Sequence, residues 1–211
     1  MSEPSDDELW QDGLQASGNG RILVLACGAL AREILALTRE FDHIDLQCLP
    51  AIFHNHPEKI VPAVKETVAN STGYERIFLV YADCGTAGEL QAVAKDLGIE
   101  MMPGPHCFAF YQGTEDFMSK TDEEFTSFYL TDFLARQFDA FIWKPLGLDR
   151  HPELLPSYFG HYEKLVYQAQ TDDPILLDKA KDCANRMGLA FEHRRTGYGD
   201  LADAMRSLGK S

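Results

Sequence analysis

The sequence lacks two features: a membrane-spanning segment and an N-terminal signal peptide. No apolar run approaches the roughly 20 residues of a membrane-spanning helix. The first 20 residues have neither the basic start nor the apolar centre of a signal peptide. They are instead acidic, with Glu3, Asp6, Asp7, Glu8 and Asp12. We therefore predict a cytoplasmic protein in which residues 1–20 form an acidic tail that is disordered or only loosely docked.

Basic side chains are also scarce. The 211 residues include 33 Asp and Glu against 19 Lys and Arg, which gives a formal net charge of -14. A surface of this sign repels phosphate backbones and anionic lipids, so we expect neither nucleic acid nor a membrane as a partner. A small-molecule ligand remains the expected partner. The hydrophobic content of 45% excludes disorder of the whole chain.

Apolar runs of strand length alternate with segments of helical spacing through most of the chain. This alternation predicts an α/β fold with a mostly parallel sheet, a Rossmann-like three-layer sandwich with helices on both faces. The length suits one domain, which we place at 21–211 with a helical insertion at about 108–160 that includes a helix over 125–141. The predicted strands are 21–26, 44–53, 76–81, 99–102, 164–168 and 189–193, and the predicted helices outside the insertion are 29–41, 57–68, 87–97, 174–187 and 202–208.

Soft and polar residues follow the predicted strands, at the edge where open α/β sheets bind ligands. Cys27, Cys84 and Cys107 end the first, third and fourth strands, and His54 ends the second. Glycine follows Cys27 and Cys84, which favours exposed turns, and a helix N-terminus would lower the thiol pKa towards thiolate. Cys48 and Cys183 lie inside a strand and a helix, so we interpret both as packing residues.

Three thiolates and one imidazole match the ligands of tetrahedral zinc. We predict a metal site of Cys27, His54, Cys84 and Cys107, with zinc favoured over iron and His106 as a substitute ligand or base. The ligands lack the short CxxC spacing of structural zinc sites. Two other interpretations stay open. One cysteine could be a nucleophile with His54 or His106 as its base, or the cysteines could line a metal-free pocket for an organic ligand.

Other polar residues near the strand ends are candidates for substrate binding. The loop over 83–88 contains two glycines and precedes a helix, so its backbone N–H groups could bind an anion, although no Walker motif is present. Arg194 and Arg195 could hold a carboxylate or phosphate. Asp132 either bonds to a neighbour or orients a histidine of the site. The full candidate set is Asn55, Gly85, Thr86, Gln170, Arg194, Arg195 and Tyr198.

Eight phrases occur in order between Arg21 and Leu201: ACGALAREI, FHNHPEKI, YADCGTAGEL, GPHCFAFYQG, FYLTDFL, LGLDRHPEL, YFGHYEKLVYQAQTDD and RRTGYGDL. Together they resemble domain-of-unknown-function family 1638, an uncharacterised bacterial and archaeal family. The resemblance implies functional positions at Cys27, at His54 with Asn55, at Cys84 with Gly85, and at Cys107. It also implies corrinoid methyltransferase system components as partners, and hence one-carbon or methylamine-type metabolism. GPHC departs from the His-Asp-Cys form of other members, which leaves the role of His106 open.

Two functions are consistent with such a site. In a metalloenzyme, the metal would act as a Lewis acid or activate a thiol or water. In a carrier, sensor or accessory protein, it would be bound without turnover. Four protein ligands leave no open position on a tetrahedral metal, so catalysis would require one ligand to exchange with substrate.

Overall fold

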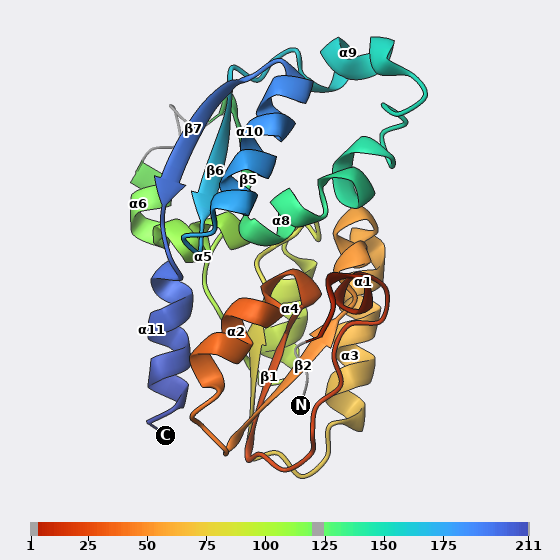
Figure 1. The fold of residues 1–211 in the computed structure, drawn as a ribbon. Coiled ribbons are helices and arrows are strands. Elements are labelled where there is room, and N and C mark those ends of the chain that lie inside the picture. The colour runs from red at the N-terminus through yellow and green to blue at the C-terminus, as the bar shows by residue number, and fades with distance from the viewer. Residues whose placement is uncertain (1–3, 120–124, 211) are drawn as a thin grey trace. The chain divides into compact units, whose positions relative to one another are not determined.

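The computed structural model describes residues 4–119 and 125–210. These residues form two compact units, the first made of residues 4–110 with 200–210 and the second of the described residues between 111 and 199. Each unit has its own parallel β-sheet, of four strands in the first and three in the second (Figure 1). The predicted α/β class with parallel strands is confirmed, but the strands belong to two sheets where we predicted one.

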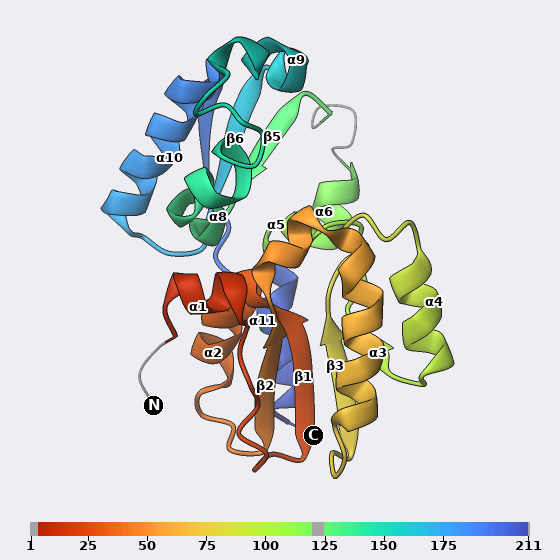
Figure 2. The same cartoon turned by 90° about the vertical axis from the view of Figure 1, so that its right-hand side faces the viewer.

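The sheet of the first unit has the order β2-β1-β3-β4. All neighbours are parallel. Strand β1 is central and its side chains from Ile22 to Ala26 are buried, which explains why this segment is apolar without alternation. Helices α3 and α4 cover one face of the sheet, and α2 and α11 cover the other (Figure 2). The elements are β1 (Ile22–Cys27), α2 (Ala31–Thr38), β2 (Ile44–Leu49), α3 (Ile60–Asn70), β3 (Arg76–Val80), α4 (Glu89–Asp96), β4 (Glu100–Met101) and α11 (Gly199–Leu208).

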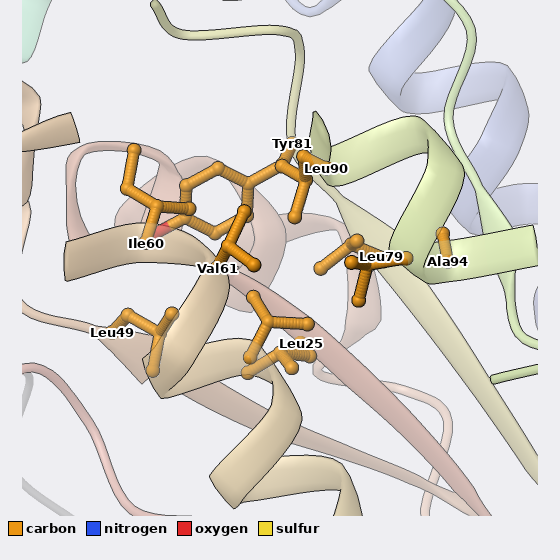
Figure 3. Packing of buried hydrophobic residues seen from close by; sticks show 10 residues of the cluster. Leu25, Leu49, Ile60, Val61, Leu79, Tyr81, Leu90 and Ala94 are labelled. Atoms are coloured by element: carbon orange, nitrogen blue, oxygen red, sulfur yellow. The ribbon is translucent and has the colours of Figure 1, made fainter. Parts of the chain in front are cut away.

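The main hydrophobic cluster of this unit lies between the sheet and helices α3 and α4 (Figure 3). Leu25 and Leu79 are paired on neighbouring strands and pack against Val64 and Leu90 from the helices. All four side chains are fully buried. Full burial of one leucine-sized side chain contributes about 1.5–3 kcal/mol, so this face anchors the strand ends that carry the candidate site.

The acidic N-terminal segment, which we predicted to be a disordered or loosely docked tail, is folded from Ser5 onward. Helix α1 (Asp6–Gln11) begins with a capping box in which Ser5 and Glu8 satisfy each other's backbone N–H groups. Leu9 is fully buried, and Leu14 pairs with Cys48 at the edge of β2. Residues 1–3 lie outside the described part of the chain.

The second unit contains β5 (Ser127–Leu130), β6 (Lys164–Ala169) and β7 (Ala190–Arg195), in that order. Helix α10 (Pro174–Met187) has the predicted bounds, beginning at a cap from Asp173 and ending at Gly188. The predicted helix over 125–141 is wrong, because this segment contains β5, α8 (Asp132–Arg136) and the start of a π-helical turn, η4 (Asp139–Trp143). The other elements are α5 (Cys107–Gln112), which begins in the first unit, α6 (Thr114–Ser119), η5 (Pro152–Leu154) and α9 (Leu155–Phe159).

A buried carboxylate joins β5 and α8 to the end of β6. Asp132 accepts hydrogen bonds from the Tyr167 hydroxyl at 2.7 Å and from the backbone N–H of Gln170 at 3.1 Å. Thr171 donates to it from its backbone N–H at 2.9 Å and from its hydroxyl at 2.6 Å. In return, the Asp132 N–H donates to the side-chain oxygen of Gln170 at 2.7 Å. Asp132 therefore bonds to structural neighbours, which is one of the two roles expected from the sequence.

A second carboxylate gives the first unit an acid-sensitive contact. Asp45 on β2 is 5% exposed and accepts from the Ser17 hydroxyl, the Gly20 N–H at 3.0 Å and the Tyr74 hydroxyl at 2.8 Å. Burial alone would raise the pKa of Asp45, but these hydrogen bonds outweigh it and the pKa is lowered. The carboxylate form is therefore bound more strongly in the folded chain than in the unfolded chain.

This contact predicts how stability depends on pH. Because the folded pKa of Asp45 is depressed, its contribution is complete above the unfolded pKa and is lost as pH falls through the folded pKa. We expect the stability difference between the wild type and Asp45→Asn to be constant above about pH 5 and to shrink below it. Urea unfolding at several pH values measures this difference, with Asp96→Asn on the exposed side of α4 as the control. A difference that does not change down to pH 2 would contradict the assignment.

Across the described residues, no helix combines the length and the apolar character needed to cross a bilayer.

Candidate functional site

Three cysteines lie at the carboxyl end of the first sheet, as the sequence predicts. Cys27 is the last residue of β1, Cys84 lies in the loop between β3 and α4, and Cys107 begins α5. All three are free and partly exposed, whereas Cys48 and Cys183 are free and buried. Strands β1, β2 and β3 end on the same side of this unit (Figure 2). The structure therefore separates the cysteines into the two classes expected from their sequence positions.

The three sulfurs are close enough to perturb one another's ionisation. Burial and the neighbouring Cys27 thiol raise the pKa of Cys107 to about 12. Burial, followed by the charges of Cys107 and Cys27, raises the pKa of Cys84 further. Burial also raises the pKa of Cys27. Each thiol is therefore protonated at neutral pH in the metal-free chain.

This result corrects the expectation that helix N-termini would lower the thiol pKa. The segment after Cys27 is the short 3₁₀ turn η1 (Gly28–Leu30), and α4 begins five residues beyond Cys84. The backbone N–H groups near Cys27 and Cys107 do lower the pKa, but desolvation is the larger effect. The sulfurs are neighbours, yet no group of three or more His, Cys, Asp or Glu side chains within 4–119 and 125–210 has the arrangement to hold a metal ion.

The loop that carries Cys84 has an unusual backbone. Cys84 and Ala87 have positive φ angles of 47° and 52°, and Gly85 and Gly88 have 81° and 86°. A residue with a side chain is strained in this left-handed region by roughly 1–2 kcal/mol, and such strain is concentrated at functional sites. A Cβ on Gly85 would lie 3.4 Å from the Cβ of Pro57. The Cys84 loop therefore passes beside the turn that follows β2.

The backbone N–H groups of this loop, which we predicted could bind an anion, bind a carboxylate of the loop instead. The Asp83 carboxylate accepts from the backbone N–H of Gly88 at 2.6 Å and of Ala87 at 3.2 Å. The Thr86 hydroxyl donates to the Asp83 carbonyl at 2.7 Å. The hydrogen bond from Gly88 is the largest influence on the pKa of Asp83, which is lowered. The loop is thus held rigidly from within, and Thr86, predicted to bind substrate, bonds to the loop.

His54, the predicted fourth ligand, lies on the 3₁₀ turn η2 (Ala51–Asn55) that follows β2. Its side chain reaches solvent, while the protein around it lowers its pKa by desolvation. Because this pKa is lowered from an ordinary value that is already below 7, the imidazole is mostly neutral at pH 7. Asn55 shares this turn, and His106 is exposed directly before Cys107. The structure places both histidines at the sheet edge of the cysteines.

Tyr81 is a residue of this region that our sequence reasoning missed. It follows β3 directly, is 2% exposed and belongs to the main hydrophobic cluster, against which Cys27 and Cys84 also pack. Its hydroxyl is buried without a hydrogen-bond partner of regular geometry. The hydroxyl is nevertheless near enough to Cys27 to lower the pKa of that thiol. The available sequence signal was a tyrosine at the end of an apolar strand, three residues before a cysteine in a glycine-containing loop.

The other candidate residues belong to the second unit and have internal partners. Arg195 donates to both carboxylate oxygens of Asp172, at 2.5 and 3.1 Å, and to the carbonyls of Ala169 and Gln170 at 3.2 and 2.7 Å. The buried Gln170 side chain bonds to Asp132 and Gln168.

Arg194 bonds to Glu192 and, at 3.4 Å, to Gln112, and Tyr198 is half-buried beyond β7. These residues lie at the end of the second sheet, so the assumption that all candidates share one sheet edge is wrong.

Comparison with known proteins gives one match. The family model "Protein of unknown function (DUF1638)" matches residues 48–205. The chain belongs to this family. The matched span contains His54, Cys84 and Cys107, but it begins within β2, so Cys27 precedes it. No curated protein and no solved structure matches the chain.

Proposed function

We propose that this DUF1638 protein binds one metal ion through Cys27, Cys84 and Cys107, with His54 as the fourth ligand. The observation that carries the proposal is the proximity of three thiols, on partly exposed cysteines from three separate segments, at the carboxyl end of one parallel sheet. This edge is where open α/β sheets bind their ligands. Metal binding would draw the thiols from their present spacing into coordination distance.

The raised thiol pKa values favour a metal site over a metal-free cysteine nucleophile. A nucleophilic cysteine requires a substantial thiolate fraction near neutral pH, and burial opposes that fraction at all three positions. A bound cation reverses this effect, because it replaces the proton on each sulfur and compensates the buried negative charge. The same residues that make poor free nucleophiles therefore make suitable metal ligands.

The ligand set favours zinc. Thiolate and neutral imidazole are the preferred ligands of Zn²⁺ in tetrahedral sites, and the lowered pKa of His54 keeps its ring neutral at pH 7. Zinc also accepts ligands drawn from four separate segments, since it has no geometric preference from d electrons. His106, beside Cys107, is the substitute ligand if His54 exchanges with a small molecule. The five free thiols support a reducing, cytoplasmic location as part of this proposal.

Elemental analysis of protein purified without oxygen tests this proposal. We expect about one zinc per chain in the wild type and less than a tenth of that in Cys27→Ser, Cys84→Ser and Cys107→Ser, because each substitution removes one of the three anionic sulfur ligands. Cys183→Ser, which alters a buried cysteine in α10 of the second unit, should keep its zinc. Substoichiometric metal in the wild type, or equal metal in all four variants, would contradict the proposal.

Replacement of His54 tests whether this histidine is the fourth metal ligand. In His54→Ala, three thiolates remain, so we expect zinc to be retained with weaker affinity and the fourth position to become open to water. His56→Ala is the matched control, since His56 lies on the next turn and pairs with Glu58 at 3.5 Å. Equal zinc affinity in the two variants would remove His54 from the ligand set and favour His106.

A further inference from the structure

Tyr81 is placed beside Cys27 by the register of the first sheet. Strands β1 and β3 are parallel and pair Leu25 with Leu79 and Ala26 with Val80. The next positions along the two strands are Cys27 and Tyr81. Paired residues in parallel strands point to the same face, so both belong to the face covered by α3 and α4. Both are in fact in or against the hydrophobic cluster on that face.

The ring of Tyr81 lies over the hydrophobic cluster at the end of β3. Figure 3 shows it extending from beside Leu90 towards Ile60, with its hydroxyl oxygen at the end near Ile60. Cys48 does not share this face. It pairs with Ala26, and Cys27 pairs with Leu49, so Cys48 points to the opposite side of the sheet. Of the two cysteines on β1 and β2, Cys27 is therefore the one that shares a face with the Tyr81 hydroxyl.

In the metal-free chain, the Tyr81 hydroxyl meets the neutral Cys27 thiol without regular hydrogen-bond geometry. A buried hydroxyl without a good hydrogen bond destabilises a protein relative to one that has a good partner. Phenylalanine would fill the same apolar space at no such cost. A neutral thiol is only a weak acceptor, whereas a thiolate accepts a strong, charge-assisted hydrogen bond. The site therefore contains a donor whose best acceptor is present only when Cys27 is deprotonated.

We propose that Tyr81 is a positioning residue of the metal site, whose hydroxyl donates a hydrogen bond to the Cys27 sulfur when that sulfur is a metal-bound thiolate. This inference rests on the proposed function and adds to it the outer partner of one ligand. Hydrogen bonds to metal-bound sulfur orient the ligand and reduce its electron donation to the metal. The proton lost on metal binding comes from the Cys27 thiol, and the phenol keeps its own.

Cobalt(II) is a suitable probe, because its thiolate charge-transfer absorption reports the electron donation of sulfur. For Tyr81→Phe we expect about tenfold weaker Co²⁺ affinity than the wild type, the lower end of outer-partner effects. We also expect the sulfur-to-cobalt band to move to longer wavelength, because an unbonded thiolate donates electrons more easily. The stability of the metal-free chain should be unchanged or slightly higher, since the substitution removes an unsatisfied hydroxyl. Tyr129→Phe, a buried tyrosine on β5, is the control.

The possible outcomes distinguish the two proposals. If wild-type protein does not bind Co²⁺, the proposed function fails and the role of Tyr81 fails with it. If the wild type binds Co²⁺ but Tyr81→Phe has the same affinity and the same absorption band, the metal site stands and the role of Tyr81 is overturned. A weaker affinity with an unshifted band and a destabilised metal-free chain would show that Tyr81 only fills space, which also overturns it.

Discussion

Replacing Asp132 with alanine should destabilise the second unit by about 3–5 kcal/mol, because each buried donor left without an acceptor costs about 1–3 kcal/mol. Asp132 is 1% exposed, and the variant would leave the Tyr167 hydroxyl and the Gln170 N–H buried without a partner. The two donors of Thr171 would also lose their acceptor, but solvent can reach Thr171 and replace it in part. Urea unfolding followed by the fluorescence of Trp143, in a Trp10→Phe background, reports this unit.

Two further variants show whether the loss comes from this network. Tyr167→Phe removes one donor and leaves the carboxylate its other three hydrogen bonds, so we expect a loss of about 1 kcal/mol. Asp178→Ala removes a carboxylate whose ion pair with Lys181 lies on the exposed side of α10, and it should change stability by less than about 0.5 kcal/mol. A loss below 1 kcal/mol for Asp132→Ala would show that Asp132 does not hold β5, α8 and β6 together.

The features that the sequence predicts well are those with a local physical cause. Helix α10 is an example, because Asp173 caps its first turn, Pro174 occupies the first helical position and Gly188 ends it with a φ of 71°. The capping box at the start of α1 was equally local, since Ser5 and Glu8 have the required spacing. Acidic composition outweighed that signal, so a helix with a fully buried leucine was predicted to be a disordered or loosely docked tail.

The two-sheet arrangement depends on contacts between distant residues and had no comparable local signal. Six strand-like segments in a row are consistent with one sheet or with two, because the choice depends on which strands pair. Predicting a helix over 125–141 also favoured a single sheet. It left out β5, the edge strand that pairs with β6 in the second sheet. Thr131 marks the true helix start, as its hydroxyl accepts from the Leu134 N–H at 3.3 Å. That cap was hidden among aromatic residues with helical spacing.

The candidate site was predictable in position but not in ionisation. Strand ends and glycine-containing turns identified Cys27, Cys84 and Cys107, because the carboxyl ends of parallel strands meet at one edge. Their pKa values depend on how deeply each thiol is buried and how near the others are, and neither quantity is encoded in spacing. Tyr81 was missed for a related reason. A tyrosine in an apolar strand is usually a core residue, and only the three-dimensional structure shows its hydroxyl without a regular partner.

Zinc affinity should rise about a thousandfold for each unit of pH near neutrality, because three protonated thiols each release one proton when metal binds. The sign follows from the raised pKa values of Cys27, Cys84 and Cys107, which keep all three sulfurs protonated until metal displaces the proton. His54 adds no proton above pH 7, since desolvation lowers its pKa. Competition with a chelator of known pH dependence between pH 6.5 and 8 measures the slope.

The number of released protons also identifies the ligands one at a time. If Cys84→Ser retains measurable affinity, its slope should fall to about a hundredfold per pH unit, because two thiols remain. Cys183→Ser should keep the wild-type slope, since Cys183 is buried in α10 of the second unit. Calorimetry in buffers of different ionisation enthalpy counts the same protons independently. A wild-type slope near zero would mean that the metal is held by groups already deprotonated at pH 7, and the cysteines would then return to the role of half-buried packing residues at the strand ends.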